Sequence, residues 1–161
     1  MTGYEDPLVG VKIRLAGDNP NRSKAWPCVA VILNTTVPVG SHGISADVWQ
    51  PQGKLALDWD FTEEFSLGTT LVYSDLSDNG QRFGQFAASL SADHALTKDW
   101  GIYLEAYAFS KESASGSSTR YLDSGLSYLV SNDVQLDIRV GRGLDSPHPN
   151  WYTGLGAAVR W

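Results

Sequence analysis

The feature that most constrains this chain is the alternation of apolar and polar side chains, which recurs along almost its whole length. Successive side chains of an extended strand point to opposite faces, so alternation with a period of two predicts β-strands. Segments of this kind cover residues 8–15, 26–39, 54–61, 66–74, 82–94, 100–109, 121–130, 134–141 and 151–161. Their connections are too short for crossover helices. We therefore expect an all-β fold, an antiparallel meander of about nine strands.

The predicted strands are long for a globular sheet. Several have roughly 9–11 residues, where strands of soluble proteins usually have about 5–6 and a tilted transmembrane strand needs about 9–11. The chain has 161 residues, so we expect a single domain, residues 1–161. Its net charge of −6 comes without a basic stripe, which argues against a nucleic-acid partner.

The connections fall into two classes that alternate along the chain. Short turns are expected at residues 62–65, 96–100 and 131–133, although the segment 17–25 breaks the rule by being long. Longer loops rich in Gly, Ser, Asp and Pro are expected at residues 41–53, 75–81, 110–118 and 144–150. Short turns at one end of the sheet and long loops at the other are typical of an outer-membrane barrel.

Bulky apolar side chains collect on one face of the predicted strands, and charged or polar side chains on the other. A soluble lipocalin-like binding barrel has the same alternation, with its apolar face inside, so alternation leaves both barrels open. The aromatic side chains favour a lipid bilayer, because on the apolar face they gather at strand ends, as interfacial girdles do. Beside the short turns stand Trp59, Phe61, Trp100, Tyr128 and Trp161, and beside the long loops stand Tyr73 and Trp151.

The last strand resembles the C-terminal signal of bacterial outer-membrane barrels. Gly156, Val159 and the terminal aromatic Trp161 stand in matching places. The resemblance implies that the barrel-assembly machinery is a partner of this chain and that the bacterial outer membrane is its location.

A larger resemblance covers nearly the whole chain. The segments DPLVGVKIRL and VPVGSHG, and two long segments that begin at Gly68 and Tyr121, are similar to the transporter-like outer-membrane proteins of the phenol-degradation (meta-pathway) family. The resemblance implies an outer-membrane β-barrel that takes up small hydrophobic or aromatic compounds. It supplies no catalytic residues that could be carried over to this sequence.

One departure from that family affects the expected architecture. Family members are longer and begin with a signal peptide and further strands, which this sequence lacks. Bacterial barrels use even strand numbers, and a bilayer does not tolerate open sheet edges. We therefore expect an N-terminally truncated chain, the C-terminal part of a barrel of about twelve strands. A miscount by one strand is the alternative.

The sequence does not favour an enzyme. A hydrolase needs a nucleophile, a base and an orienting acid within reach of one another. His42 and His148 fall in different loops, and His94 falls near a short turn on the apolar face. Their spacing also does not fit a shared metal site. We expect no catalytic residues, no metal and no cofactor.

The polar face carries the candidate functional residues. Glu105, Asp123, Asp137 and Arg139 fall on three successive strands, and Tyr103, Tyr107 and Tyr121 flank them. One interpretation is a polar and aromatic constriction that selects solutes by charge and stacking. The other is an ion-pair network that fills a narrow barrel, because buried charges must be paired.

Two further expectations concern the same face. Arg139 is the expected shared cation of the three carboxylates, because its planar guanidinium can bind two of them at once. Gly125, Gly154 and Gly156 are expected to leave room opposite longer side chains or to let strands bend. The function classes left open are an uptake channel, a structural or adhesion barrel with a side-chain-filled lumen, and the soluble lipocalin-like barrel.

Overall fold

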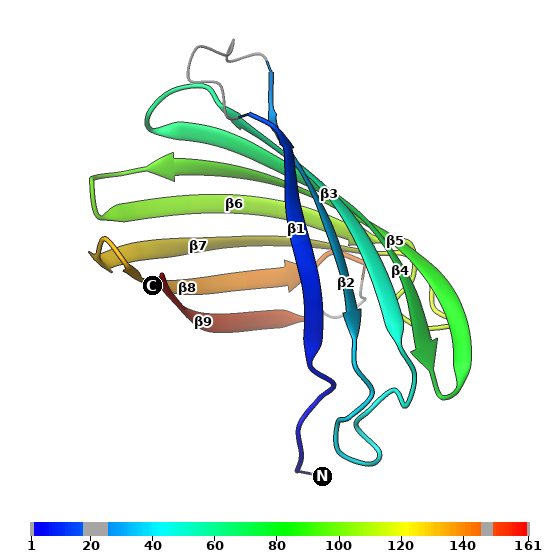
Figure 1. Cartoon of the computed structure of the whole chain (residues 1–161). Coiled ribbons are helices and arrows are strands. Elements are labelled where there is room, and N and C mark those ends of the chain that lie inside the picture. The colour runs from blue at the N-terminus through cyan, green and yellow to red at the C-terminus, as the bar shows by residue number, and fades with distance from the viewer. Residues whose placement is uncertain (1, 18–25, 146–149, 161) are drawn as a thin grey trace.

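The computed structural model describes residues 2–17, 26–145 and 150–160, which form one antiparallel sheet (Figure 1). Each strand pairs with the strands before and after it in the chain, which confirms the predicted all-β meander. The strands are β1 (Leu8–Ala16), β2 (Cys28–Thr36), β3 (Gln50–Asp60), β4 (Phe65–Asp78), β5 (Gln81–Ala95), β6 (Trp100–Phe109), β7 (Thr119–Ser131), β8 (Val134–Gly143) and β9 (Trp151–Val159).

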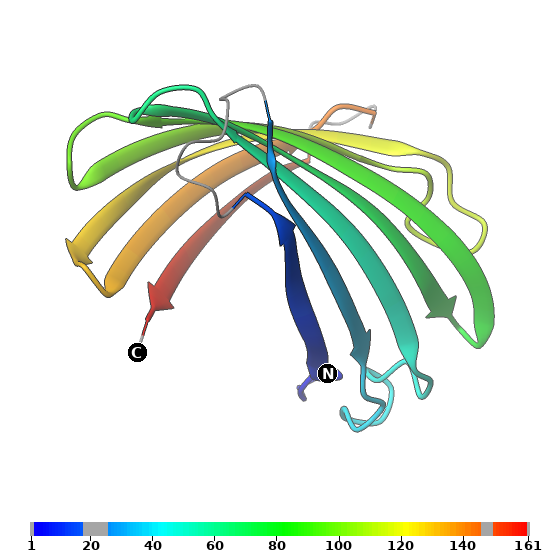
Figure 2. The same cartoon turned by 45° about the horizontal axis from the view of Figure 1, so that its top comes forward.

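The sheet is strongly curled but not closed. Figure 2 shows the strands arched into a dome, with β1 in blue and β9 in red as its two edges. Among the described residues β1 pairs only with β2, and β9 only with β8. An open, curled meander of this kind is consistent with an incomplete β-barrel. The described part of the chain contains no helix long and apolar enough to cross a membrane.

The connections confirm the two ends of the sheet, with one correction. β3 and β4, β5 and β6, and β7 and β8 are joined by short turns at one end, hereafter the short-turn end. The prediction of a long loop at residues 75–81 is wrong, because β4 and β5 continue to Asp78 and Gln81. Asn79 and Gly80 form a two-residue turn with φ of 49° and 79°. Asn–Gly is the residue pair that a type I′ hairpin turn favours, since both positions need positive φ.

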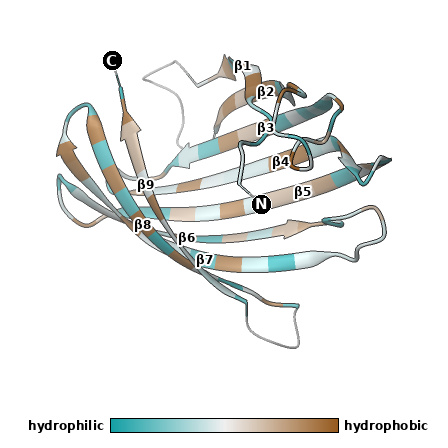
Figure 3. Ribbon diagram, turned by 90° about the horizontal axis from the view of Figure 1, so that it is seen from below, coloured by the Kyte–Doolittle hydropathy of each residue, from teal (hydrophilic) through white to brown (hydrophobic). Residues whose placement is uncertain are grey.

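The two faces of the sheet differ in exposure and in chemistry. Side chains from β3 to β8 line a single hollow of about 330 Å³, and only the concave side of a curved sheet can bring six strands together. Most of its lining residues belong to the polar parity, including Glu105 and Asp123, and Ala88 and Ala108 of the other parity also contribute. The apolar parity lies on the convex side, where Leu104 and Ile138 are 52% and 53% exposed. Figure 3 shows the resulting alternation of hydrophobic and hydrophilic residues along the strands. This arrangement is the reverse of a lipocalin-like barrel.

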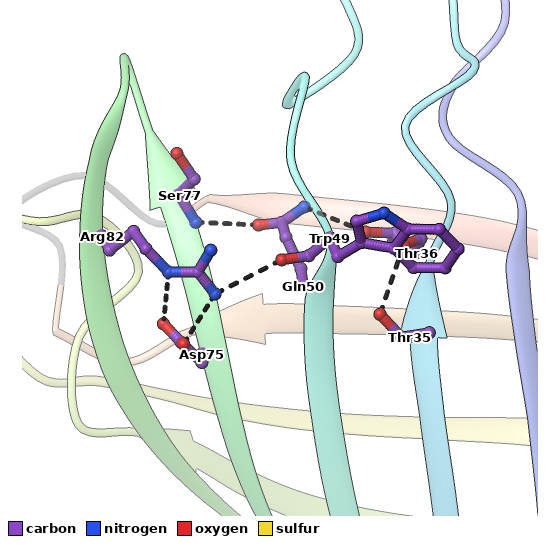
Figure 4. Close-up of polar contacts among 7 residues, drawn as sticks. All are labelled: Thr35, Thr36, Trp49, Gln50, Asp75, Ser77 and Arg82. Carbon is purple, nitrogen blue, oxygen red and sulfur yellow. Dashed lines mark hydrogen bonds and ion pairs between the residues drawn. The ribbon is translucent and has the colours of Figure 1, made fainter.

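Polar side chains complete the sheet at the opposite end, hereafter the long-loop end, where the β4–β5 hairpin extends beyond β3 (Figure 4). The Ser77 amide donates to Oε1 of Gln50 at 2.9 Å, which replaces the partner that β3 no longer provides. Arg82 pairs with Asp75 at 2.6 Å and also donates to the carbonyl of Trp49 at 3.3 Å. These bonds attach the hairpin to the end of β3.

The segment before β1 is held at the same end by Asp6. Its carboxylate accepts hydrogen bonds from the amides of Gly40 at 2.8 Å and Ala46 at 3.0 Å. Hydrogen bonds from the Ser45 hydroxyl and from these amides lower the pKa of Asp6 below its ordinary value. Asp6 therefore attaches the segment before β1 to the connection between β2 and β3.

Candidate functional site

The concave face of β6 to β9 brings the predicted lumen residues into three successive rows. Glu105 and Asp123 lie directly opposite each other on β6 and β7. Arg139 lies one row nearer the short-turn end, opposite Gly125 on β7. Asp137 lies one row further in the same direction. All four charged residues therefore belong to one face, at staggered rather than equal heights.

The predicted tyrosines form an aromatic cluster next to these rows. Tyr107 and Tyr121 face each other on β6 and β7, and their rings stack with centroids 4.9 Å apart and 12° between planes. The Phe109 ring meets both edge-on, at 5.8 Å and 6.1 Å. The Tyr121 hydroxyl donates to Oε1 of Glu112 at 2.6 Å. Tyr103 lies apart from this cluster, over Gly125 of β7.

Sequence reasoning missed a central member of the cluster, Tyr152 on β9. Its hydroxyl donates to Oδ2 of Asp123 at 3.0 Å and lies 2.7 Å from the hydroxyl of Tyr107. Tyr152 occupies the same row as Asp123, with Gly141 of β8 between them. Counting this register across β8 could have found it. Tyr152 is the donor that the nearly buried Asp123, 3% exposed, has in place of an arginine.

The prediction that Arg139 is the shared cation of the carboxylates is wrong for the described residues. No carboxylate oxygen among them lies within 4.0 Å of its guanidinium nitrogens. The ion pairs that the described residues do form lie at the ends of the sheet and include Arg120 with Asp145. The Arg120 guanidinium lowers the pKa of the Asp145 carboxyl by hydrogen bonding and charge. Among the described residues, the concave face is therefore not held together by an ion-pair network centred on Arg139.

The predicted role of the glycines in leaving room is confirmed. A Cβ atom on Gly125 would lie 2.5 Å from the Tyr103 ring, and one on Gly154 would lie 2.7 Å from Nε of Arg139. A Cβ on Gly156 would collide with the Asp137 carboxylate, and one on Gly141 with the Tyr152 ring. Long side chains of the concave face thus lie flat across a neighbouring strand at positions where that strand has no side chain.

The connection between β6 and β7 folds against the concave face near the long-loop end (Figure 2). Nε2 of Gln85 donates to the carbonyl of Lys111 at 2.6 Å. The Lys111 ammonium lies 5.3 Å from the centre of the Phe83 ring, which is 8% exposed. Lys111 therefore lies on the same side of the sheet as the tyrosine cluster.

The predicted girdle residues lie on the convex face where the structure describes them. Trp100 and Tyr128 are cross-strand partners with rings 4.7 Å apart, and Trp59 lies opposite Leu67. Further aromatic contacts are Phe61 with Phe65 at 6.0 Å, Tyr73 with Phe86 at 4.9 Å and Trp151 with the Arg142 guanidinium at 5.7 Å. Trp161 lies outside the described residues. The two girdle levels and the assembly signal of Gly156, Val159 and Trp161 stay predictions.

The hollow of the concave face has room for a small solute, about 330 Å³. Its lining carries both signs of charge and an aromatic wall: Lys54, Glu105, Tyr107, Phe109, Asp123 and Arg139. No three His, Cys, Asp or Glu side chains of the described residues come together as a metal site requires. The arrangement suits binding through ring contacts and hydrogen bonds.

Comparison with known families decides the relationship of the chain. The family described as "Putative MetA-pathway of phenol degradation" matches residues 1–161. The chain belongs to this phenol-degradation family. A comparison with curated proteins finds no match. The family name fits a concave face lined with tyrosines only loosely, since it names a pathway and no step.

Proposed function

We propose that this sheet is part of the wall of a bacterial outer-membrane β-barrel, which passes small hydrophobic or aromatic compounds. The observation that carries the proposal is the sidedness of the sheet. Large apolar side chains are exposed on the convex face, and polar and tyrosine side chains line the concave face. A barrel wall between lipid and a wet lumen requires this distribution.

The exposed apolar surface supports a bilayer as the partner of the convex face. Monomeric soluble proteins rarely expose contiguous apolar patches beyond a few hundred Å². Here Leu104 on β6, Ile138 on β8 and Leu155 on β9 are 52%, 53% and 85% exposed on one face of the sheet. In water this face would promote aggregation, whereas in lipid it would meet acyl chains.

The same proposal includes the route to the membrane. An outer-membrane barrel is delivered and folded by the barrel-assembly machinery, which would read the terminal segment with Gly156 and Val159. On the proposed function the short-turn end faces the periplasm and the long-loop end faces outward. On this proposal the chain catalyses no reaction and binds no nucleic acid.

A structural barrel with a filled lumen is the second candidate, favoured by a specific observation. The hydroxyls of Tyr107 and Tyr152 meet at 2.7 Å across two intervening strands, which covers part of the concave wall with protein. A closed barrel packed throughout in this way would pass no solute. Charges of both signs in the remaining hollow, Lys54 and Arg139 with Glu105, favour a wet lumen over a dry core.

Solute uptake by liposomes separates the two candidates. The protein is reconstituted in liposomes of bacterial phospholipid, and the entry of phenol, toluene and glucose is compared with entry into empty liposomes. A channel for aromatic compounds should raise the rate for phenol or toluene severalfold and leave glucose near the background. Uptake equal to that of empty liposomes for all three solutes would contradict the channel and favour the filled barrel.

A further inference from the structure

The Tyr152 side chain occupies a place that has the chemistry of a binding site for a phenol. The hydroxyl of Tyr152 donates to Oδ2 of Asp123 and meets the hydroxyl of Tyr107. Its ring meets the Tyr121 ring edge-on, with centroids 6.4 Å apart and 66° between planes. A tyrosine side chain is itself a phenol on a tether. We name the surrounding residues, Tyr107, Tyr121, Asp123 and Gly141, the Tyr152 site.

The floor of the Tyr152 site is backbone. β8 carries glycine at both positions of its concave face here, Gly141 and Gly143. A Cβ atom on Gly141 would collide with the Tyr152 ring, so the ring lies directly over the strand. Tyr152 is half-buried and is the second residue of β9. Its side chain can swing away without breaking the pairing of β8 with β9.

Asp123 gives the site its preference for a hydroxyl. The Asp123 side chain is 3% exposed, and the Tyr152 hydroxyl is its hydrogen-bond donor. Its other oxygen, Oδ1, is buried without a partner among the described residues. A buried carboxylate that loses its donor is costly. When Tyr152 leaves, the site therefore favours a ligand that brings a hydroxyl of its own.

We propose that the Tyr152 site binds small hydroxylated aromatic solutes and that the Tyr152 side chain is a tethered competitor for them. A phenol would lie over Gly141 beside the Tyr121 ring and donate its hydroxyl to Asp123, as Tyr152 does. This inference rests on the proposed function, because the solute reaches the site from the lumen. A phenol can bind only while the Tyr152 ring is displaced. Its apparent affinity is therefore the intrinsic affinity of the site multiplied by the fraction of molecules in which the site is open.

The test compares ligand binding to the protein with and without the Tyr152 side chain. Wild type, Tyr152→Ala and Tyr103→Ala are folded into detergent micelles, and isothermal titration measures binding of phenol, anisole and cyclohexanol against micelles alone. Tyr152→Ala should bind phenol roughly tenfold more tightly than wild type, the factor that about 1.4 kcal/mol gives. Anisole cannot donate and cyclohexanol cannot stack, so both should bind this variant at least about tenfold more weakly than phenol.

The control removes a tyrosine of the same face that does not cover Asp123. Tyr103 lies over Gly125, and Tyr103→Ala should not raise the affinity for phenol. If Tyr152→Ala does not fold, Tyr152→Phe decides. It keeps the ring but cannot donate to Asp123, so it competes less well, and phenol affinity should rise severalfold. The inference is overturned if no folded Tyr152 variant gains affinity for phenol, or if anisole gains as much.

Liposome uptake keeps this inference separate from the proposed function. If Tyr152→Ala binds phenol tightly but wild-type liposomes take up no aromatic solute, the channel fails and the binding site stands. If liposomes take up phenol but neither Tyr152 variant gains affinity, the channel stands and the Tyr152 site is wrong.

Discussion

The convex and concave faces of the same strands follow opposite rules. On β6, Leu104 is 52% exposed on the convex face, while its neighbour Glu105 lines the concave hollow. On β7, Leu122 is 41% exposed and Asp123 is 3% exposed. In water the hydrophobic effect would bury the leucines and expose the acids. On the proposed function, this difference arises because the convex face meets lipid in place of water.

The two faces also differ in how they hold their side chains in place. On the concave face of β6 to β9, long polar side chains lie across glycines of the neighbouring strand, as Tyr152 does over Gly141. On the convex face Gly53 has its nearest neighbour, Cδ2 of Leu33, 3.8 Å from the Cβ position. On the same convex face, however, a Cβ on Gly84 would lie 2.9 Å from the Tyr73 hydroxyl, so side chains packed over glycines occur on both faces but are most frequent on the concave face of β6 to β9.

Placing a charge on the convex face should have the largest effect. On the proposed function Leu104 lies within the apolar band, so Leu104→Arg should destabilise the protein in liposomes by about 2–4 kcal/mol. Urea titration of the reconstituted protein measures this. Leu104→Ala, which removes the side chain without adding charge, should cost clearly less. An equal loss of stability in the arginine and alanine variants would contradict a lipid-facing convex face.

A pair of glycine substitutions tests the dependence of the concave face on shape. Gly141→Ala puts a Cβ atom into the Tyr152 ring and should destabilise by about 1–3 kcal/mol, the usual cost of overpacking. Gly53→Ala on the convex face meets only ordinary contact and should change stability by less than about 0.5 kcal/mol. Urea titration of both variants in one lipid mixture gives the difference. A neutral Gly141→Ala would mean that Tyr152 does not lie over β8.

Acid should loosen the long-loop end through Asp6, which is the smallest effect. Because the folded-state pKa of Asp6 lies below its ordinary value, the stabilisation is complete above the ordinary pKa of about 3.9 and is lost as the pH falls through the lowered value. Hydrogen exchange of the Gly40 and Ala46 amides, corrected for intrinsic rates, measures the loss.

Asp6→Asn is the control for that experiment. It removes the charge at every pH, so the same amides should exchange faster than in wild type already at neutral pH. Unchanged protection of Gly40 and Ala46 at low pH would contradict the role of the Asp6 carboxylate.

The fold could be predicted from the sequence because alternation runs through most of every strand and is interrupted only near strand ends, as at Arg14–Ala16 and Leu129–Ser131. The period of two places Leu104 and Glu105 on opposite faces wherever the strand begins. The prediction of a long loop between β4 and β5 is wrong because the Gly, Ser and Asp content of residues 75–81 is typical of a loop, whereas the Asn–Gly pair within it favours a two-residue hairpin turn. Composition describes a loop, but a residue pair with positive φ decides its length.

The candidate site was less predictable because it depends on the register across four strands. Parity placed Asp123 and Arg139 on one face, but the structure puts them in different rows, so Arg139 makes no ion pair with it. Tyr152 lies two strands from Asp123 and reaches it only because Gly141 between them lacks a side chain. That contact follows from shape, which a pattern of polarity does not contain.

The central claim is that the convex face meets lipid and the concave face meets water. Two adjacent alanines of β5 test it directly: Ala88 is exposed and shares the convex parity of Leu90, and Ala87 is half-buried and shares the concave parity of Gln85. In a Cys28→Ser background, which removes the chain's single cysteine, each is changed to Cys and spin-labelled in liposomes. The label at residue 88 should be relaxed by oxygen and not by a water-soluble nickel chelate, and the label at residue 87 should respond in the opposite way. Relaxation of both labels by the nickel chelate would contradict the claim.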